Sequence, residues 1–334
     1  MYIDFYLLSK NMAKYIGRQI KVWFGKEGTR GTAASSFIWT PKTDLSFNDK
    51  AETIQDESSI GSIVDTRDSF VIKKFGEWDF SGNVELNSFG NILLATLGSV
   101  TTTAASTGAY SHAFDLNNTN NTQTLTIAVE DPVEWDRVFP LSAIESLTIT
   151  AEEGQMITYT ASFKSKGSES QSVTISYSDD YKMLSRYSVF KVASNLAWLD
   201  AASAVCIKSF ELTITKNIED DYCLGSITPR DYVNKQVSIE GSFTAMYEAT
   251  TNKDLHLNGT KKAIRFELVD TATTIGVSDN PTLSFDLPLA AFTEWDKTQG
   301  NDEVVMETIT FKGLYSNTDQ SAIEVEMINT KSSY

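Results

Sequence analysis

The sequence has few of the residues from which metal centres and most catalytic sites are built. Its 334 residues include two cysteines, Cys206 and Cys223, and two histidines, His112 and His256. A structural zinc site needs four such ligands at short, characteristic spacings, and these four residues do not provide them. We therefore predict no metal and no cofactor, and we expect both cysteines to be buried as small apolar side chains.

Positive charge is also scarce. Lysine and arginine total 28 against 44 aspartate and glutamate residues, which gives a formal net charge of −16. Proteins that bind nucleic acid use cationic groups to displace the counterions of phosphate, so this balance disfavours a sequence-reading nucleic-acid binder.

Long apolar runs are missing as well. No segment approaches the ~20 apolar residues that span a bilayer. The first ten residues, MYIDFYLLSK, lack the basic start, apolar centre and small-residue cleavage site of a secretory signal, so we expect synthesis in a cytosol. With 6 prolines and no long biased tract, the chain should fold throughout, as two domains of ordinary size.

No spacing typical of a nucleophile elbow, a phosphate-binding glycine loop or a paired-histidine metal motif occurs. The string Glu134–Asp136 and its counterpart Glu294–Asp296 each place two acids beside a tryptophan, which could suggest sugar hydrolysis. Because the string occurs once in each half of the chain, it favours a tryptophan anchored in the core or at a subunit contact. We predict that the protein is not an enzyme.

The dominant pattern is alternation with a period of two, which is typical of strands with one buried and one wet face. Residues 157–163 alternate Ile, Tyr, Ala and Phe with Thr and Ser, and residues 80–86 and 239–247 behave in the same way. The fold class that this predicts is all-β, built mostly from antiparallel sheet.

Helical pattern is limited to two short segments. Residues 88–98 place Phe89, Leu93 and Leu97 on one stripe, with Asn87 or Ser88 as the N-cap and a glycine at the end. Residues 250–259 also end on glycine but offer only two leucines to bury.

The second half of the chain repeats landmarks of the first in the same order. The matched pairs are Ser59–Ile63 with Cys223–Ile227, each followed by Arg-Asp; Gly82 with Gly241; Gly98 with Gly259; Phe114–Leu116 with Phe266–Leu268; Glu134–Asp136 with Glu294–Asp296; and Phe163–Lys164 with Phe311–Lys312. This order predicts two tandem β modules. We expect an N-terminal arm at 1–40, a first module at 41–165, a connector at 166–203 with one strand near 187–192, and a second module at 204–334.

A sheet with one polar face leaves that face in water, and its edges carry unpaired backbone groups that invite another strand. Two such modules side by side could continue edge to edge into neighbouring chains until the sheet closes on itself. A ring-shaped inner β-barrel is the expected product of oligomerisation.

The arm KVWFGKEGTRGTA, the phrase ELNSFGNILLATLG, the ending VVMETITFKGLYSNTDQSAIEVEMINT and the landmark order resemble the tail tube proteins of long-tailed bacteriophages, in the subset with two fused tube modules. The resemblance covers nearly the whole chain from Met12 onward. It implies a virion protein whose homotrimeric, pseudo-sixfold rings stack into a channel for the genome. The implied partners are further copies of the chain and tape-measure, tail-terminator and baseplate proteins, with DNA only in passage.

The dimensions agree with this expectation. Four strands from each of six modules give about 24 strands, which at ~4.8 Å spacing and ~40° tilt form a barrel ~48 Å across, wide enough for duplex DNA. Carboxylates lining the bore would repel phosphate.

Two loops are candidate contacts between stacked rings, because their charges are of mixed sign. Their charged residues are Asp56, Glu57, Arg67 and Asp68 in the first half, and Arg230 and Asp231 in the second. A baseplate hub or distal tail ring, which stops at a single ring, and a two-domain β-sandwich adhesin or lectin are the alternative interpretations.

Overall fold

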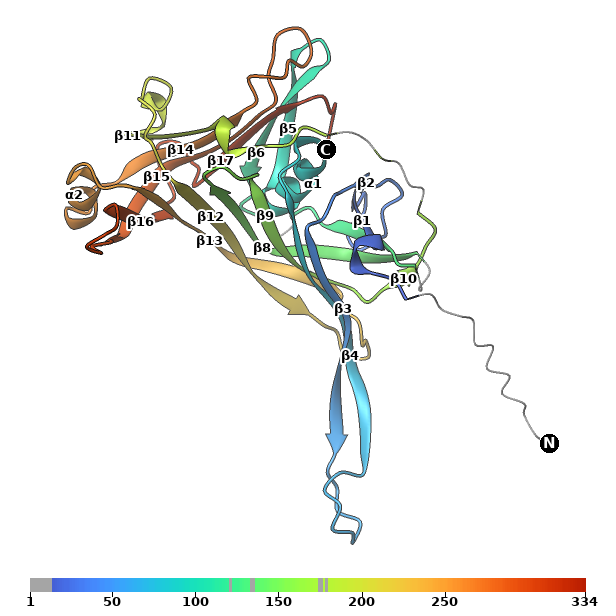
Figure 1. Ribbon diagram of the computed structural model, residues 1–334. Helices are drawn as coiled ribbons and strands as arrows, with labels where there is room; N and C mark the ends of the chain where they lie inside the picture. Colours follow the sequence, from blue (N-terminus) through green and yellow to red (C-terminus); the bar gives the residue numbers. More distant parts are fainter. Residues whose placement is uncertain (1–13, 120–121, 133–135, 174–176, 178–179) are drawn as a thin grey trace.

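The computed structural model describes residues 14–119, 122–132, 136–173, 177 and 180–334, and it consists almost entirely of antiparallel β-structure (Figure 1). The predicted all-β class is confirmed. Within these residues no helix is both long and apolar enough to cross a membrane. Met12, from which the resemblance runs, lies outside the described residues.

Eight strands form one continuous antiparallel sheet, which we call the main sheet. In spatial order they are β3 (Asp44–Asp56), β4 (Asp68–Asn83), β9 (Thr158–Ser165), β8 (Arg137–Glu152), β12 (Ser209–Asp221), β13 (Asp231–Met246), β16 (Met306–Gly313) and β15 (Thr282–Lys297). The first four strands come from the first half of the chain and the last four from the second, and β8 pairs with β12 where the halves meet.

Shorter strands extend the first parts of β8 and β15. β7 (Leu125–Glu130) pairs with β8 and with β1 (Lys21–Lys26), and β1 also pairs with β2 (Ile38–Trp39). In the same manner β14 (Lys262–Val269) pairs with β15 and with β11 (Ser188–Ala193). β11 lies where the sequence predicts a strand, near residues 187–192. On their other side β8 and β15 pair with β10 (Glu169–Ser170) and β17 (Glu324–Asn329).

One hairpin has no equivalent in the second half. β5 (Gly98–Ser106) and β6 (Ala109–Leu116) form it, and β6 pairs with β17 near the end of the chain. The C-terminal strand therefore joins the two halves at a second place. The described residues also form three single turns of 3-10 helix, at Gly17–Gln19, Ser185–Tyr187 and Leu196–Trp198.

The two halves of the main sheet share strand lengths and register. β3 and β12 have 13 residues each, β4, β13, β8 and β15 have 16, and β9 and β16 have 8. Irregularities in pairing also recur: the β8–β9 ladder shifts after Ile144, and the β15–β16 ladder shifts after Phe292. In both ladders the residue before the shift is paired with a phenylalanine, Phe163 or Phe311.

This shared register supports three of the six landmark matches and contradicts three. The hairpin loops, the glycines that end the helices and the two Phe-Lys pairs occupy corresponding places. Gly241 instead takes the place of Trp78, because Phe311 faces Gly241 whereas Phe163 faces Trp78. Phe114 lies on β6, whose hairpin has no counterpart, while Phe266 lies on β14. Short strings of strand residues match by chance more easily than ladder positions do.

The acid-tryptophan-acid match fails for a similar reason. Glu294–Asp296 lies inside β15, whereas Asp136 comes before β8 begins. Glu134 and Trp135 lie outside the described residues. The expected anchoring role fits the second string, because Trp295 packs against the core and its Nε1 donates to Glu307 at 2.8 Å.

The main core lies on the apolar face of the sheet, where one residue of each strand meets its neighbours in a continuous row. From β4 to β15 this row contains Gly82, Tyr159, Ile149, Leu212, Gly241, Phe311 and Phe292. Helix α1 (Leu86–Leu97) covers the first half of it, and Phe89 packs on the ring of Tyr159 at 4.8 Å between centroids.

The ends of the two helices test the predicted caps. Gly98 ends α1 in the left-handed region at φ 96°, as predicted. The predicted N-cap at Asn87 or Ser88 is wrong, because these residues already belong to the helix. Their backbone N–H groups donate to the carboxylate of Asp180 from the connector, at 2.7 and 2.9 Å. The second helix, α2 (Thr251–Leu257), forms where predicted and has no buried residue.

The prediction of buried cysteines is also wrong. Cys206 and Cys223 are both free and exposed. Cys206 precedes β12 and Cys223 lies in the loop after it, so neither belongs to the alternating pattern that carries side chains into the core.

Candidate assembly surfaces

The main sheet ends in two open edges. Within the described part of the chain β3 pairs only with β4, so its outer backbone groups have no strand partner. At the far end, β14 covers the outer side of β15 as far as Ala290, and the described residues supply no strand beside the remainder, which ends at Lys297. Unpaired edges of this kind are templates for another strand.

A groove lies at the beginning of β3, where Asp44 and Leu45 line it. It has a volume of about 750 Å³ and lies between the arm segment 17–22 and the segment 39–45 that leads into β3. The groove reaches only this first part of β3.

The junction of β8 with β12 shows how a strand can pair with an edge of this kind. On this edge of β8, β7 pairs as far as Ser142, and β12 takes over from Ser146 to Glu152. Across the junction the hydroxyls of Thr148 and Thr213 lie 2.9 Å apart. An edge shared by two successive strands is therefore already built once inside the molecule.

The face of the main sheet opposite the core is polar from strand to strand. One row across it contains Ser81, Thr160, Thr148, Thr213, Glu240 and Lys312. Within the row, Ser81 and Thr160 lie 3.0 Å apart and Lys312 donates to Glu240 at 2.7 Å. Such a face satisfies its own polar groups and can stand in water.

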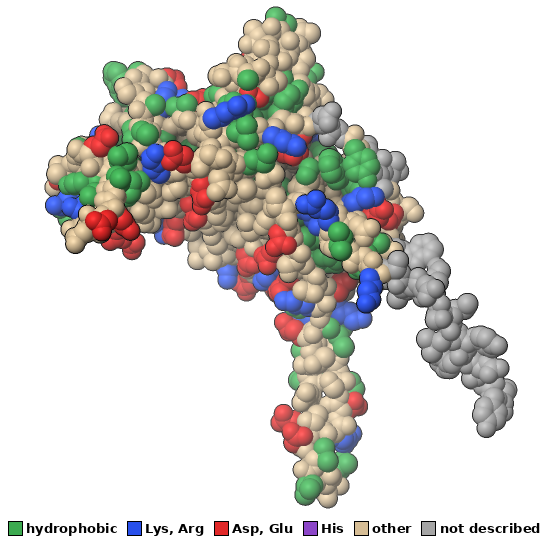
Figure 2. Space-filling model, in the orientation of Figure 1, with side chains coloured by type: hydrophobic (Ala, Val, Ile, Leu, Met, Phe, Trp, Pro, Cys, Tyr) green, Lys and Arg blue, Asp and Glu red, His purple; other side chains and the backbone are tan. Residues whose placement is uncertain are grey.

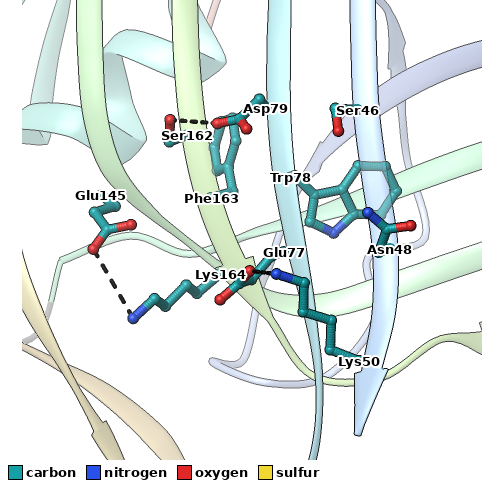
Figure 3. A pocket seen from close by; sticks show the side chains of 10 residues that line it. All are labelled: Ser46, Asn48, Lys50, Glu77, Trp78, Asp79, Glu145, Ser162, Phe163 and Lys164. Atoms are coloured by element: carbon teal, nitrogen blue, oxygen red, sulfur yellow. Dashed lines mark hydrogen bonds and ion pairs between the residues drawn. The ribbon is translucent and has the colours of Figure 1, made fainter.

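Charges on this face are mixed, with an excess of acids. Figure 3 shows a polar pocket there of about 250 Å³, where Lys50 points to Glu77, Ser162 donates to Asp79 at 2.7 Å, and Lys164 points to Glu145. The carboxylates in the strands of this face include Glu77, Asp79, Glu211, Glu240, Glu294 and Asp296, and the ammonium groups include Lys50, Lys164 and Lys312. The predicted acidic lining thus has carboxylates available on the polar face.

The first loop residues that the sequence singles out lie at the end of the hairpin formed by β3 and β4, which projects from the body (Figure 1). Arg67 donates its backbone N–H to the backbone carbonyl of Asp56 at 2.7 Å, and its Nε lies 3.4 Å from the carboxylate of Asp56. Hydrogen bonds from the hydroxyl and N–H of Ser58 lower the pKa of Asp56. Glu57 and Asp68 are exposed on either side of this pair.

The second loop contains the same closure. Arg230 donates its backbone N–H to the backbone carbonyl of Asp221 at 2.8 Å, and its guanidinium lies 2.6 and 2.7 Å from the carboxylate of Asp221. Asp231 is different, since its carboxylate accepts from Nε of Arg30 in the arm at 2.7 Å. Asp221, which sequence reasoning missed as the partner of Arg230, corresponds to Asp56 at the end of the preceding strand.

Apolar side chains gather on the projecting hairpin, and Figure 2 shows them at its end. Ile60, Ile63 and Val64 in the loop are 66%, 105% and 67% exposed, and Phe70–Ile72 on β4 are exposed as well. The second loop carries Leu224 at 105% exposure. Large apolar side chains concentrated on one projection indicate a contact surface.

Together these features define an antiparallel β-sheet protein with two open edges, one polar face and apolar hairpin ends. A model of the phage tail tube protein family matches residues 17–313, so the chain belongs to that family. A search of curated proteins finds no significant match to the chain. The protein is accordingly a structural component of a phage virion that assembles into a tube with other tail components.

Proposed function

We propose that this chain forms rings that stack into the tail tube, and that the genome passes through the bore. The observation that carries the proposal is the main sheet, which has eight strands, one polar face and an open edge at each end. Three copies joined at these edges make a barrel of about 24 strands, which at ~4.8 Å spacing and ~40° tilt is ~48 Å across. The polar face then lines the bore and the core lies outside it.

The two halves are proposed to be tandem modules at 41–165 and 204–334, joined by the connector 166–203. β1 in the arm and β11 in the connector support a refinement, because each pairs with the strand that extends β8 or β15. The arm 1–40 and the connector thus each lend one strand to the module that follows.

The hairpin loops are proposed to contact the next ring. The exposed isoleucines of the first loop would supply apolar area, and Asp56, Glu57, Arg67, Asp68 and Arg230 would supply charges of both signs. Asp231 would act indirectly, by fixing the base of the second loop to Arg30. Tape-measure, tail-terminator and baseplate proteins are the further partners, and synthesis takes place in the host cytoplasm.

The bore is proposed to repel DNA through its carboxylates. Changing Glu211 and Glu240 to lysine would place cations on the polar face, and we expect genome delivery to slow. Delivery at the normal rate with an intact tube would contradict this lining.

Electron microscopy of the purified chain in negative stain tests the proposal. Long tubes with a central channel are the expected result. Single rings that never stack at high concentration would favour a baseplate hub or distal tail ring. A monomer that persists at every concentration would contradict a tube protein and favour a two-domain β-sandwich adhesin.

A further inference from the structure

We propose a specific register for the junction between two copies of this chain. Residues Glu294–Lys297 of β15 pair antiparallel with Phe47–Lys50 of β3 in a second copy, and Glu294 lies opposite Lys50. The inference rests on the proposed ring, and it adds which strands meet and which residues face one another.

The register follows from the junction already present inside the chain. β8 corresponds to β15, because the β8–β9 and β15–β16 ladders both shift after the residue that faces a phenylalanine. Ser146, the first paired residue after the shift in β8, is therefore equivalent to Glu294 in β15. β3 corresponds to β12, because both have 13 residues and end at the Asp that closes the hairpin. Counted from these ends, Lys50 of β3 is equivalent to Thr215 of β12. Inside the chain Ser146 lies opposite Thr215. If the junction between two copies has the register of the β8–β12 junction, Glu294 of one copy lies opposite Lys50 of the next.

The strand beside the junction supports the transfer. β7 leaves β8 at Ser142 and β12 begins at Ser146. β14 leaves β15 at Ala290, and the proposed pairing begins at Glu294. Both junctions therefore leave the same interval between the covering strand and the incoming strand, so a second copy meets no obstruction from β14.

The side chains that this register brings together are complementary. Glu294 and Lys50 carry opposite charges on the polar face. On the core face Trp295 lies opposite Asp49 and Lys297 opposite Phe47, which sets Lys297 diagonal to Asp49. Facing and diagonal pairs of opposite charge stabilise antiparallel strands, whereas like charges destabilise them.

Disulfide trapping in the full chain tests the register. Cys206→Ser and Cys223→Ser first remove the two exposed thiols. Asp296→Cys and Asn48→Cys then place thiols at directly opposite positions, equivalent to Thr148 and Thr213 inside the chain. Facing Cβ atoms in antiparallel strands lie about 4.5–5.5 Å apart, within reach of a disulfide after slight adjustment. Mild oxidation of assembled protein should yield covalent oligomers that end at the closed ring.

The matched control combines Asp296→Cys with Ser46→Cys, which lies on the same face but two residues away from the proposed partner. We expect at least tenfold less cross-linking in the control. More cross-linking in the control than in the test pair, with rings intact, would overturn the register and leave the proposed function standing. If the cysteine-free parent forms no oligomer at all, both proposals fail.

A charge exchange gives a second, independent readout. Lys50→Glu alone should raise the critical concentration for assembly about fivefold, because Glu294 then faces a like charge. Adding Glu294→Lys should restore assembly. This rescue is specific for the junction, since Glu294→Lys does not restore the contact of Lys50 with Glu77 in the same chain. A double variant no better than Lys50→Glu would contradict the pairing.

Discussion

The hairpins β3–β4 and β12–β13 have the same strand lengths but opposite surroundings. In β12–β13, Lys216, Ile218, Tyr232 and Asn234 are all buried against the first half of the chain. The residues at the same places in β3–β4 are Ala51, Thr53, Ser69 and Val71, and all four are exposed. One hairpin has its neighbour within the chain, and the other has a surface ready for a neighbour from outside it.

The contrast shows how one chain can direct its own assembly. Where β12 meets β8, the contact is intramolecular and forms as the chain folds. Where β3 and β15 end the sheet, the described residues supply no strand beside Phe47–Lys50 of β3 or beside the end of β15. Stability of the single chain therefore depends on the buried hairpin, and assembly depends on the open one. Four predictions test this division.

The largest expected effect on folding is at Tyr232. Its side chain is 1% exposed and its hydroxyl donates to the backbone oxygen of Ser165 at 2.8 Å. Tyr232→Ala should lower the free energy of unfolding by about 3–5 kcal/mol, through lost packing and an unpaired carbonyl. The corresponding Ser69→Ala should change it by less than about 0.5 kcal/mol. Denaturant titration of both variants measures the difference, and equal losses would contradict the comparison.

The next effect concerns assembly. Ile60→Asp with Ile63→Asp should raise the concentration needed for tubes about a hundredfold, because two exposed isoleucines lose their apolar contact. Sedimentation of tubes measures this, with unfolding stability unchanged. Val277→Asp is the control, since Val277 is 71% exposed in the loop before β15. Equal weakening by the control would mean that any added acid hinders assembly.

A smaller effect arises at the buried Lys216. Burial, with Arg30 nearby, lowers its pKa to about 7, and its Nζ donates to the carbonyl of Ala95 at the end of α1 at 2.8 Å. The unfolded chain then binds more protons than the folded chain between about pH 7 and pH 10.5, so stability rises with pH in that window.

Between pH 7 and pH 9 the gain from Lys216 should be about 1–2 kcal/mol. Lys216→Met should remove it, whereas Lys235→Met, at a more exposed lysine of β13, should not. Denaturant titration at several pH values gives the comparison. If the free energy of unfolding of Lys216→Met rises with pH as much as that of the parent, the ammonium of Lys216 is not desolvated.

The smallest effects are expected for the Asp–Arg ion pairs that close the two hairpin loops. Arg67→Ala and Arg230→Ala each remove an exposed pair with an aspartate. Pairs as exposed as these contribute little to stability, so neither variant should shift the midpoint of denaturant unfolding measurably. A midpoint shift as large as that of Tyr232→Ala in either variant would indicate that the ion pair is part of the core.

Much of the fold could be predicted from the sequence because its strands alternate so regularly. Residues 157–163 and 239–247 fall in or next to β9 and β13, and the helix that ends at Gly98 lies within one residue of its predicted end. Periodicity and a glycine that adopts positive φ are local signals, readable without knowing the neighbours.

Features that depend on distant partners could not be predicted. The cap of α1 is a carboxylate about 90 residues away in the sequence, at Asp180, and the pairing of β17 with β6 joins strands from the two halves of the chain. Among the candidate contact residues, Asp231 looks like Asp68 in sequence, yet it pairs with Arg30. The sequence predicts that the sheet has open edges. Only the strand pairing shows that β3 and β15 form them.

A reconstruction of the assembled tube by electron cryomicroscopy tests the central claim most directly. The account predicts a wall with eight strands from each chain, in which the end of β15 lies beside β3 of the next copy and the polar face surrounds the bore. A tube in which the edge of β3 faces solvent, or in which copies meet through the loops alone, would contradict it.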